Sequence, residues 1–193
     1  MSRLYKKLVR TEREMTEKTD PMTRILSEEA IQRHREYARN LRLKYSILQK
    51  SEAMLNSLNI RDIPWQKLNL DLAREAFSLL TELSLHDCFF ASFTEKELLP
   101  LPQSVREYKS AAELLNHLYR LSYTDNDGGF LVVYKSRGKT VVGRIFPPYL
   151  ELLTFTPLLA IDLYEHAYFS DYGFDRGRYL VSALSHLNLD LLA

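Results

Sequence analysis

Two long stretches in the first half of the chain carry apolar residues at alternating steps of three and four, the spacing of amphipathic helices. The first begins after Ser27, which favours a helix N-cap, with Glu28 and Glu29 where the helix dipole favours acids. Pro64 lies between the two stretches and prevents one continuous helix. The pattern therefore predicts a helical hairpin. The first stripe consists of Ile31, His34, Ala38, Leu41, Tyr45 and Leu48, and the second, in a helix from about Asp71, of Leu72, Ala76, Leu79, Leu83, His86 and Phe90.

The second half of the chain has the pattern of a small sheet with helices. "SAAELLNHLYRL" is typical of a helix, and "FLVVYK" and "TVVGRIF" flank the turn "SRGK" as a β-hairpin. "TPLLAIDLY" predicts a third, buried strand, with Asp162 near its end and His166 in the following loop. We expect a last helix from about Arg176 to Leu191. The order of elements predicts an α+β fold.

These patterns divide the chain into a basic N-terminal arm or short presequence at 1–25, a helical hairpin domain at 26–97 and a C-terminal α/β domain at 98–193. "MSRLYKKLVR" has four basic residues and no acid, which suits a mitochondrial presequence, a basic arm or a frayed polar terminus. Cys88 is the single cysteine, which excludes a disulfide framework and a cysteine-based zinc site. No apolar run reaches the roughly 18 residues of a membrane span. The net charge of +1 is too balanced for an electrostatic nucleic-acid binder as a whole.

Four polar residues stand in apolar surroundings. His34 and His86 lie on the two helical stripes, and Asp162 and His166 follow each other closely in the chain. Three imidazoles and one carboxylate suit iron, manganese or zinc. Taken singly, each histidine is more often a hydrogen-bonded core residue than a metal ligand. Both interpretations are open at this point.

The segment "IDLYEHAYFSDY" resembles the signature Asp-x-Trp-Glu-His-Ala-Tyr-x-x-Asp-Tyr of the iron/manganese superoxide dismutase family. "LSEEAIQRH", "HDCFFASF" and "GGFLVVYKSRGKTVV" resemble three further segments of that family, so the resemblance extends from about Leu26 to the C-terminus. It implies a helical hairpin and an α/β lobe with a three-stranded antiparallel sheet. It also implies iron or manganese held by His34, His86, Asp162 and His166.

The residues around these ligands depart from the family's pattern. The tyrosine and the histidine of the family's first helix are here Arg42 and Ala38, and the glutamine four residues before the second histidine is Glu82. An ionised Glu82 would favour the oxidised metal, whereas Arg42 could attract superoxide or be a solvated helix residue. Outer residues set the redox potential and the proton supply, and each such change commonly costs about 10- to 100-fold. The pocket tryptophans of the family are replaced by Phe130, Val132 and Tyr164. We therefore expect any bound metal to turn over superoxide poorly.

The resemblance also implies a dimer, either of two copies or with a related chain. Glu165 matches the residue that reaches the partner's metal-bound histidine, and Phe169 replaces the tyrosine that would meet a histidine at position 38 of the partner, here Ala38.

We expect a superoxide-dismutase-like structural subunit of the mitochondrial small ribosomal subunit, with ribosomal proteins and rRNA as neighbours and no membrane contact. A basic strip on the first helix offers phosphate contacts, although a solvated helix face is the alternative. The strip consists of Arg33, Arg35, Arg39, Arg42 and Lys44. The alternatives are an active iron/manganese superoxide dismutase, a cytoplasmic location, a protein without bound metal, and an enzyme of altered chemistry that uses Glu82 as a further ligand or general base.

Overall fold

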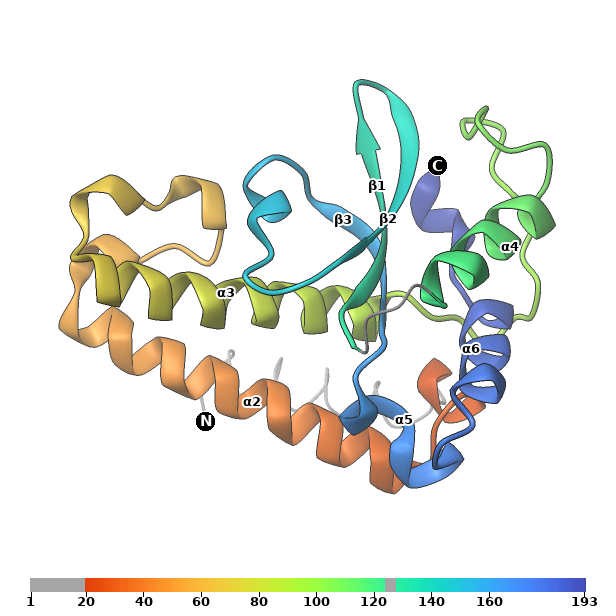
Figure 1. The fold of residues 1–193 in the computed structure, drawn as a ribbon, viewed down its shortest axis with the longest axis horizontal. Coiled ribbons are helices and arrows are strands. Elements are labelled where there is room, and N and C mark those ends of the chain that lie inside the picture. Colours follow the sequence, from red (N-terminus) through yellow and green to blue (C-terminus); the bar gives the residue numbers. More distant parts are fainter. Residues whose placement is uncertain (1–19, 124–127) are drawn as a thin grey trace, which may run out of the picture.

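A helical hairpin and a C-terminal lobe with a small sheet make up the fold (Figure 1). The computed structural model describes residues 20–123 and 128–193. The predicted basic segment "MSRLYKKLVR" lies outside these residues, and the three predicted domain ranges stay predictions. In the part of the chain that is described, no helix combines the length and the hydropathy that a membrane crossing needs.

The predicted hairpin is formed by α2 (Glu28–Ser51) and α3 (Leu70–Ala91), which lie side by side in Figure 1. Ser27 caps α2, since its side chain accepts a hydrogen bond from the Ala30 amide at 3.2 Å. The predicted stripe of α2 is buried from Ile31 to Tyr45 and partly buried at its end. More of α3 is buried than one stripe predicts, because α2 covers one side of it and β3 (Pro157–Asp162) another.

The sheet has the strand order β2-β1-β3, with antiparallel pairing throughout. The hairpin of β1 (Phe130–Ser136) and β2 (Lys139–Ile145) turns through Arg137 and Gly138, both at positive φ, which is typical of a type I′ turn. Four consecutive residues of β1 are buried, so both faces of this central strand are covered. Phe130 pairs with Asp162, which places the end of β3 beside the start of β1.

The C-terminal lobe also contains α4 (Ala111–Ser122), α5 (Glu165–Tyr172) and α6 (Arg176–Ser185). The prediction of a last helix reaching Leu191 was wrong: α6 ends at Ser185 because Leu187 then pairs with Phe93 in a short β-bridge. The prediction of a loop at His166 was also wrong, since this residue lies in the first turn of α5. The α+β fold class is confirmed.

Candidate metal centre

Each of the four predicted ligands comes from a different element. His34 lies on the buried face of α2, His86 on α3, Asp162 at the end of β3 and His166 at the start of α5. The turn between β3 and α5 is fixed by Asp162, whose Oδ1 accepts a hydrogen bond from the Tyr164 amide at 2.8 Å. This contact leaves the other carboxylate oxygen, Oδ2, directed toward the imidazoles.

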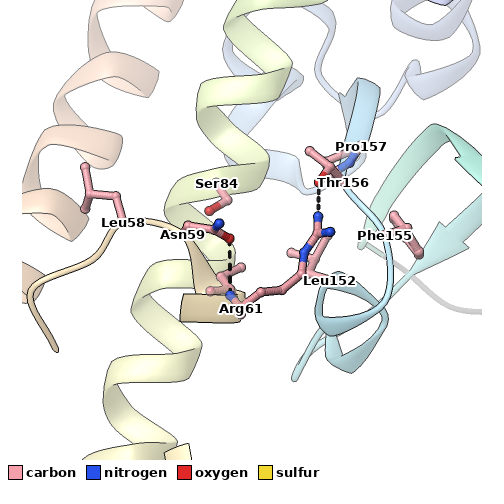
Figure 2. A pocket seen from close by; sticks show the side chains of 9 residues that line it. Leu58, Asn59, Arg61, Ser84, Leu152, Phe155, Thr156 and Pro157 are labelled. Atoms are coloured by element: carbon pink, nitrogen blue, oxygen red, sulfur yellow. Dashed lines mark hydrogen bonds between the residues drawn. The ribbon is translucent and has the colours of Figure 1, made fainter. Parts of the chain in front are cut away.

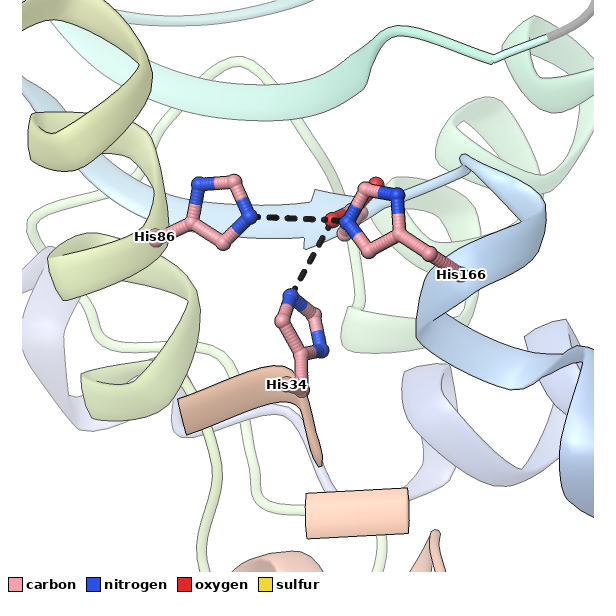
Figure 3. A group of neighbouring side chains, drawn as sticks. His34, His86 and His166 are labelled. Atoms are coloured by element: carbon pink, nitrogen blue, oxygen red, sulfur yellow. Dashed lines mark ion pairs between the residues drawn. The ribbon is translucent and has the colours of Figure 1, made fainter. Parts of the chain in front are cut away.

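The four side chains meet at one point, which we call the metal centre. The Nε2 atoms of His34, His86 and His166 lie 3.3, 3.6 and 3.1 Å from Oδ2 of Asp162. One ligand atom from each residue lies within 4.8 Å of the others. Figure 3 shows the three rings converging from α2, α3 and α5. Residues from three distant parts of the sequence therefore form one cluster.

Three of the four atoms that would bind a metal are buried and lack hydrogen-bond partners among the described residues. The side chains of His34, His86 and Asp162 are fully buried, whereas 36% of the His166 side chain is exposed. Nε2 of His34, Nε2 of His86 and Oδ2 of Asp162 lie near one another, but the described part of the chain offers them no hydrogen bond. Each such buried atom costs about 1–3 kcal/mol. A cation among them would remove this cost, and three nitrogens with one carboxylate oxygen fit iron or manganese.

Neighbouring groups set the protonation of the donors. The carbonyl oxygen of Glu82 lies 2.7 Å from Nδ1 of His86, so Nδ1 carries the hydrogen and Nε2 presents its lone pair to the centre. Burial lowers the pKa of His86. Burial alone would raise the pKa of Asp162, but the imidazoles of His166 and His34 outweigh it and hold that pKa well below its usual range. The centre therefore contains an ionised carboxylate and an unprotonated His86 nitrogen.

Aromatic rings surround the imidazoles. Tyr164 stacks on His166 with ring centroids 5.8 Å apart. Tyr37 lies 5.2 Å from the ring of His86 and 4.8 Å from that of His166, and its hydroxyl donates a hydrogen bond to Glu82. The sequence pattern did not indicate Tyr37, although its position three residues after His34 places it on the adjoining part of the helix face. Glu82 and Tyr164 thus both lie beside the metal centre.

Arg42 and Ala38 have other surroundings. The guanidinium of Arg42 donates two hydrogen bonds to the carboxylate of Asp87, at 2.8 and 2.9 Å, and both side chains are largely exposed. Ala38 is buried on α2. The charge of Arg42 is therefore largely neutralised by an adjacent acid rather than directed at the ligands.

Two of the three residues predicted for a dimer interface, Glu165 and Phe169, lie on exposed parts of α5, whereas Ala38 is buried on α2. Glu165 is exposed, and Phe169 is 44% exposed with its ring against that of Phe174, which is 89% exposed. A pocket of about 430 Å³ beside them is lined by Glu165 and His166. The exposed edge of His166 therefore faces this pocket at the start of α5.

Two of the residues predicted to contact nucleic acid form ion pairs with acidic side chains. Arg33 contacts Glu29 at 3.1 Å, and Arg35 contacts Asp20 at 2.6 Å. Arg39 and Lys44 are exposed on α2. Phosphate binding along the whole strip would therefore have to displace two ion pairs in addition to that of Arg42.

A second pocket, of about 600 Å³, lies between the connection of the hairpin and the C-terminal lobe (Figure 2). A hydrogen bond from Arg61 to Thr156 crosses it, and the side chain of Asn59 accepts a hydrogen bond from the Arg61 amide at 3.2 Å. None of the nine residues that line this pocket is a histidine, a cysteine or an acid. The larger pocket therefore lies apart from the metal centre.

Residues 103–193 match a family described as iron/manganese superoxide dismutases, C-terminal domain. This range contains the sheet, α4 to α6 and two of the ligands, Asp162 and His166. Among curated proteins, none matches this sequence. The other two ligands lie on the helical hairpin and complete the centre that the resemblance implied. Residues 103–193 are therefore similar to the C-terminal domain of iron/manganese superoxide dismutases.

Proposed function

We propose that this protein binds iron or manganese through His34, His86, Asp162 and His166 and serves as a structural subunit with little dismutase activity. The convergence of the four ligand atoms within 4.8 Å supports metal binding most directly. When bound, such an ion supplies one-electron redox chemistry between two oxidation states. The protein's own residues hold the donor atoms, exclude water from three of them and keep His86 in the tautomer that binds.

The surroundings of the ligands support a weak catalyst. Glu82 places a carboxylate where the family's pattern has an amide, and the hydroxyl of Tyr37 already donates to it. Arg42, the cation that could attract superoxide, is paired with Asp87. Changes of this kind commonly cost about 10- to 100-fold each, so two of them multiply to about 10²- to 10⁴-fold.

The assembly that we propose is the mitochondrial small ribosomal subunit, which the chain would join as a homodimer or with a related superoxide-dismutase-like chain. The exposed face of α5, with Glu165 and Phe169, supports pairing because an exposed aromatic surface favours a partner. Arg39 and Lys44 are exposed and offer phosphate contacts to rRNA.

Metal analysis and assembly assays test these proposals. We expect close to one iron or manganese ion per chain and dismutase rates far below the diffusional limit of about 10⁸–10⁹ M⁻¹s⁻¹. In a sucrose gradient of mitochondrial extract, the chain should sediment with the small ribosomal subunit and shift to lighter fractions when the subunits are dissociated. Purified chain without metal would contradict the metal site, and exclusively light fractions would contradict the ribosomal assignment.

An active superoxide dismutase, which converts superoxide to oxygen and hydrogen peroxide, is the second candidate. The complete ligand set and the exposed edge of His166 favour it. Rates near the diffusional limit that disappear in His166→Ala, with metal content measured in parallel, would establish this activity and overturn our assignment of a weak catalyst.

A further inference from the structure

A tyrosine and a carboxylate stand together at the edge of the metal centre. Tyr37 follows His34 on α2 by three residues, and Glu82 precedes His86 on α3 by four. The ring of Tyr37 adjoins the rings of His86 and His166, and its hydroxyl donates to Oε1 of Glu82. This pair therefore connects the two helices of the hairpin directly beside the ligands.

Two contacts fix the position of Glu82. Its carbonyl oxygen accepts the hydrogen of His86 Nδ1 at 2.7 Å, and its carboxylate accepts the hydroxyl of Tyr37. In this contact the phenol hydroxyl of Tyr37 is the hydrogen-bond donor and the carboxylate is the acceptor. The half-buried carboxylate is consequently tied to a tyrosine whose ring lies against two of the ligands.

Two carboxylates lie near this pair. That of Glu82 accepts the hydroxyl of Tyr37, and Oδ2 of Asp162 faces the three imidazoles. Arg42 belongs to the same hairpin, but its guanidinium is engaged by both oxygens of Asp87. An anion that approaches the centre between α2 and α3 therefore meets the carboxylate of Glu82. Arg42 does not offset this charge, because it is paired with Asp87.

We propose that Glu82, positioned by Tyr37, makes this metal centre exclude small anions while it admits small neutral molecules. The inference rests on the proposed metal binding and deepens it, because it names the class of molecule that the centre accepts. Repulsion between like charges about 6–12 Å apart at an effective dielectric constant near 20 corresponds to roughly 10- to 100-fold in affinity. Superoxide is an anion, so the same carboxylate would also disfavour dismutation.

Ligand binding to iron-loaded protein tests this inference without an activity assay. Azide binding to the ferric protein is followed by its charge-transfer absorption, and nitric oxide binding to the ferrous protein by electron paramagnetic resonance. Glu82→Gln removes the charge and keeps the shape, and we expect it to tighten azide binding by roughly 10- to 100-fold and to leave nitric oxide binding unchanged. Tyr37→Phe releases the carboxylate and should tighten azide binding less than Glu82→Gln does.

The matched control is Glu75→Gln, which makes the same charge change at an exposed position two turns earlier on α3. Equal effects of Glu75→Gln and Glu82→Gln would overturn the inference, since only the overall charge would then matter. Equal tightening of azide and nitric oxide by Glu82→Gln would also overturn it, because access rather than charge would be responsible. Normal iron content with unchanged azide affinity would overturn this inference and leave metal binding intact, whereas failure to take up iron would overturn both.

Discussion

Removing one ligand should measurably reduce the stabilisation that metal binding gives to the fold. His166→Ala is the best change, because His166 is the one ligand with a partly exposed side chain, so its loss leaves little empty space in the core. The other three donors are fully buried. The variant should therefore fold without metal and still bind metal weakly.

The size of the effect follows from ligand linkage. A ligand at about 100 to 1,000 times its dissociation constant stabilises the folded state by about 2.7–4.1 kcal/mol. For a chain of this length, each kcal/mol corresponds to about 2–4 °C in Tm, so the wild-type protein should gain about 5–16 °C. If the loss of His166 weakens binding at least about 10-fold, this gain should fall by at least about 3 °C.

Thermal unfolding of the chelated protein, with and without added manganese, measures the difference. The matched control is His117→Ala on α4, outside the metal centre. The Nδ1 atom of His117 shares a hydrogen bond with the Tyr108 hydroxyl at 2.9 Å. We expect His117→Ala to keep the full manganese-dependent gain. Equal gains in wild type and His166→Ala, or no gain in wild type, would refute the assignment of these residues as ligands.

Three further predictions concern the sheet and the helix α3, which surround the metal centre. Gly129→Ala should destabilise the folded protein more than Gly138→Ala does. Both glycines have positive φ, but a Cβ at Gly129 would lie 2.6 Å from a backbone oxygen of β2, whereas one at Gly138 would meet no neighbour. Urea denaturation of the two variants measures the difference. Ser92→Ala should cost about 1–3 kcal/mol in urea denaturation, because its hydroxyl oxygen accepts the buried amide of Ala160 at 2.8 Å; an unchanged midpoint would contradict this. Burial raises the pKa of Cys88 to about 12, so at pH 8 a thiol reagent should label it slowly in the folded protein and rapidly in denaturant, and fast labelling of folded protein would contradict the assigned burial.

The elements with strong local signals were predictable from the sequence. Ser27 caps α2 as expected, and the turn at Arg137 and Gly138 has the positive φ values that its sequence favours. The end of α6 was not predictable in the same way, because it depends on the bridge between Leu187 and Phe93, which are far apart in the chain. Local propensity decided the first two features, and tertiary pairing decided the third.

The metal centre could be predicted only in part. Periodicity placed His34 and His86 on buried faces, but no spacing rule shows that the two faces meet Asp162 at the same point. The resemblance to a family supplied that convergence. The resemblance concerned Ala38 and Arg42 on this helix, whereas the residue that contacts the centre is Tyr37, three positions after His34.

The position of the ligands explains how a protein could keep them after losing catalysis. The four donors lie on α2, α3, β3 and α5, so a bound ion links the helical hairpin to the C-terminal lobe. Such a link stabilises the fold whether or not the ion changes its oxidation state, because linkage depends only on affinity for the folded state. Redox turnover depends in addition on the groups beside the ligands, such as Glu82 and Tyr37. In a structural subunit, the ligands would therefore be retained for stability while the groups beside them were free to change.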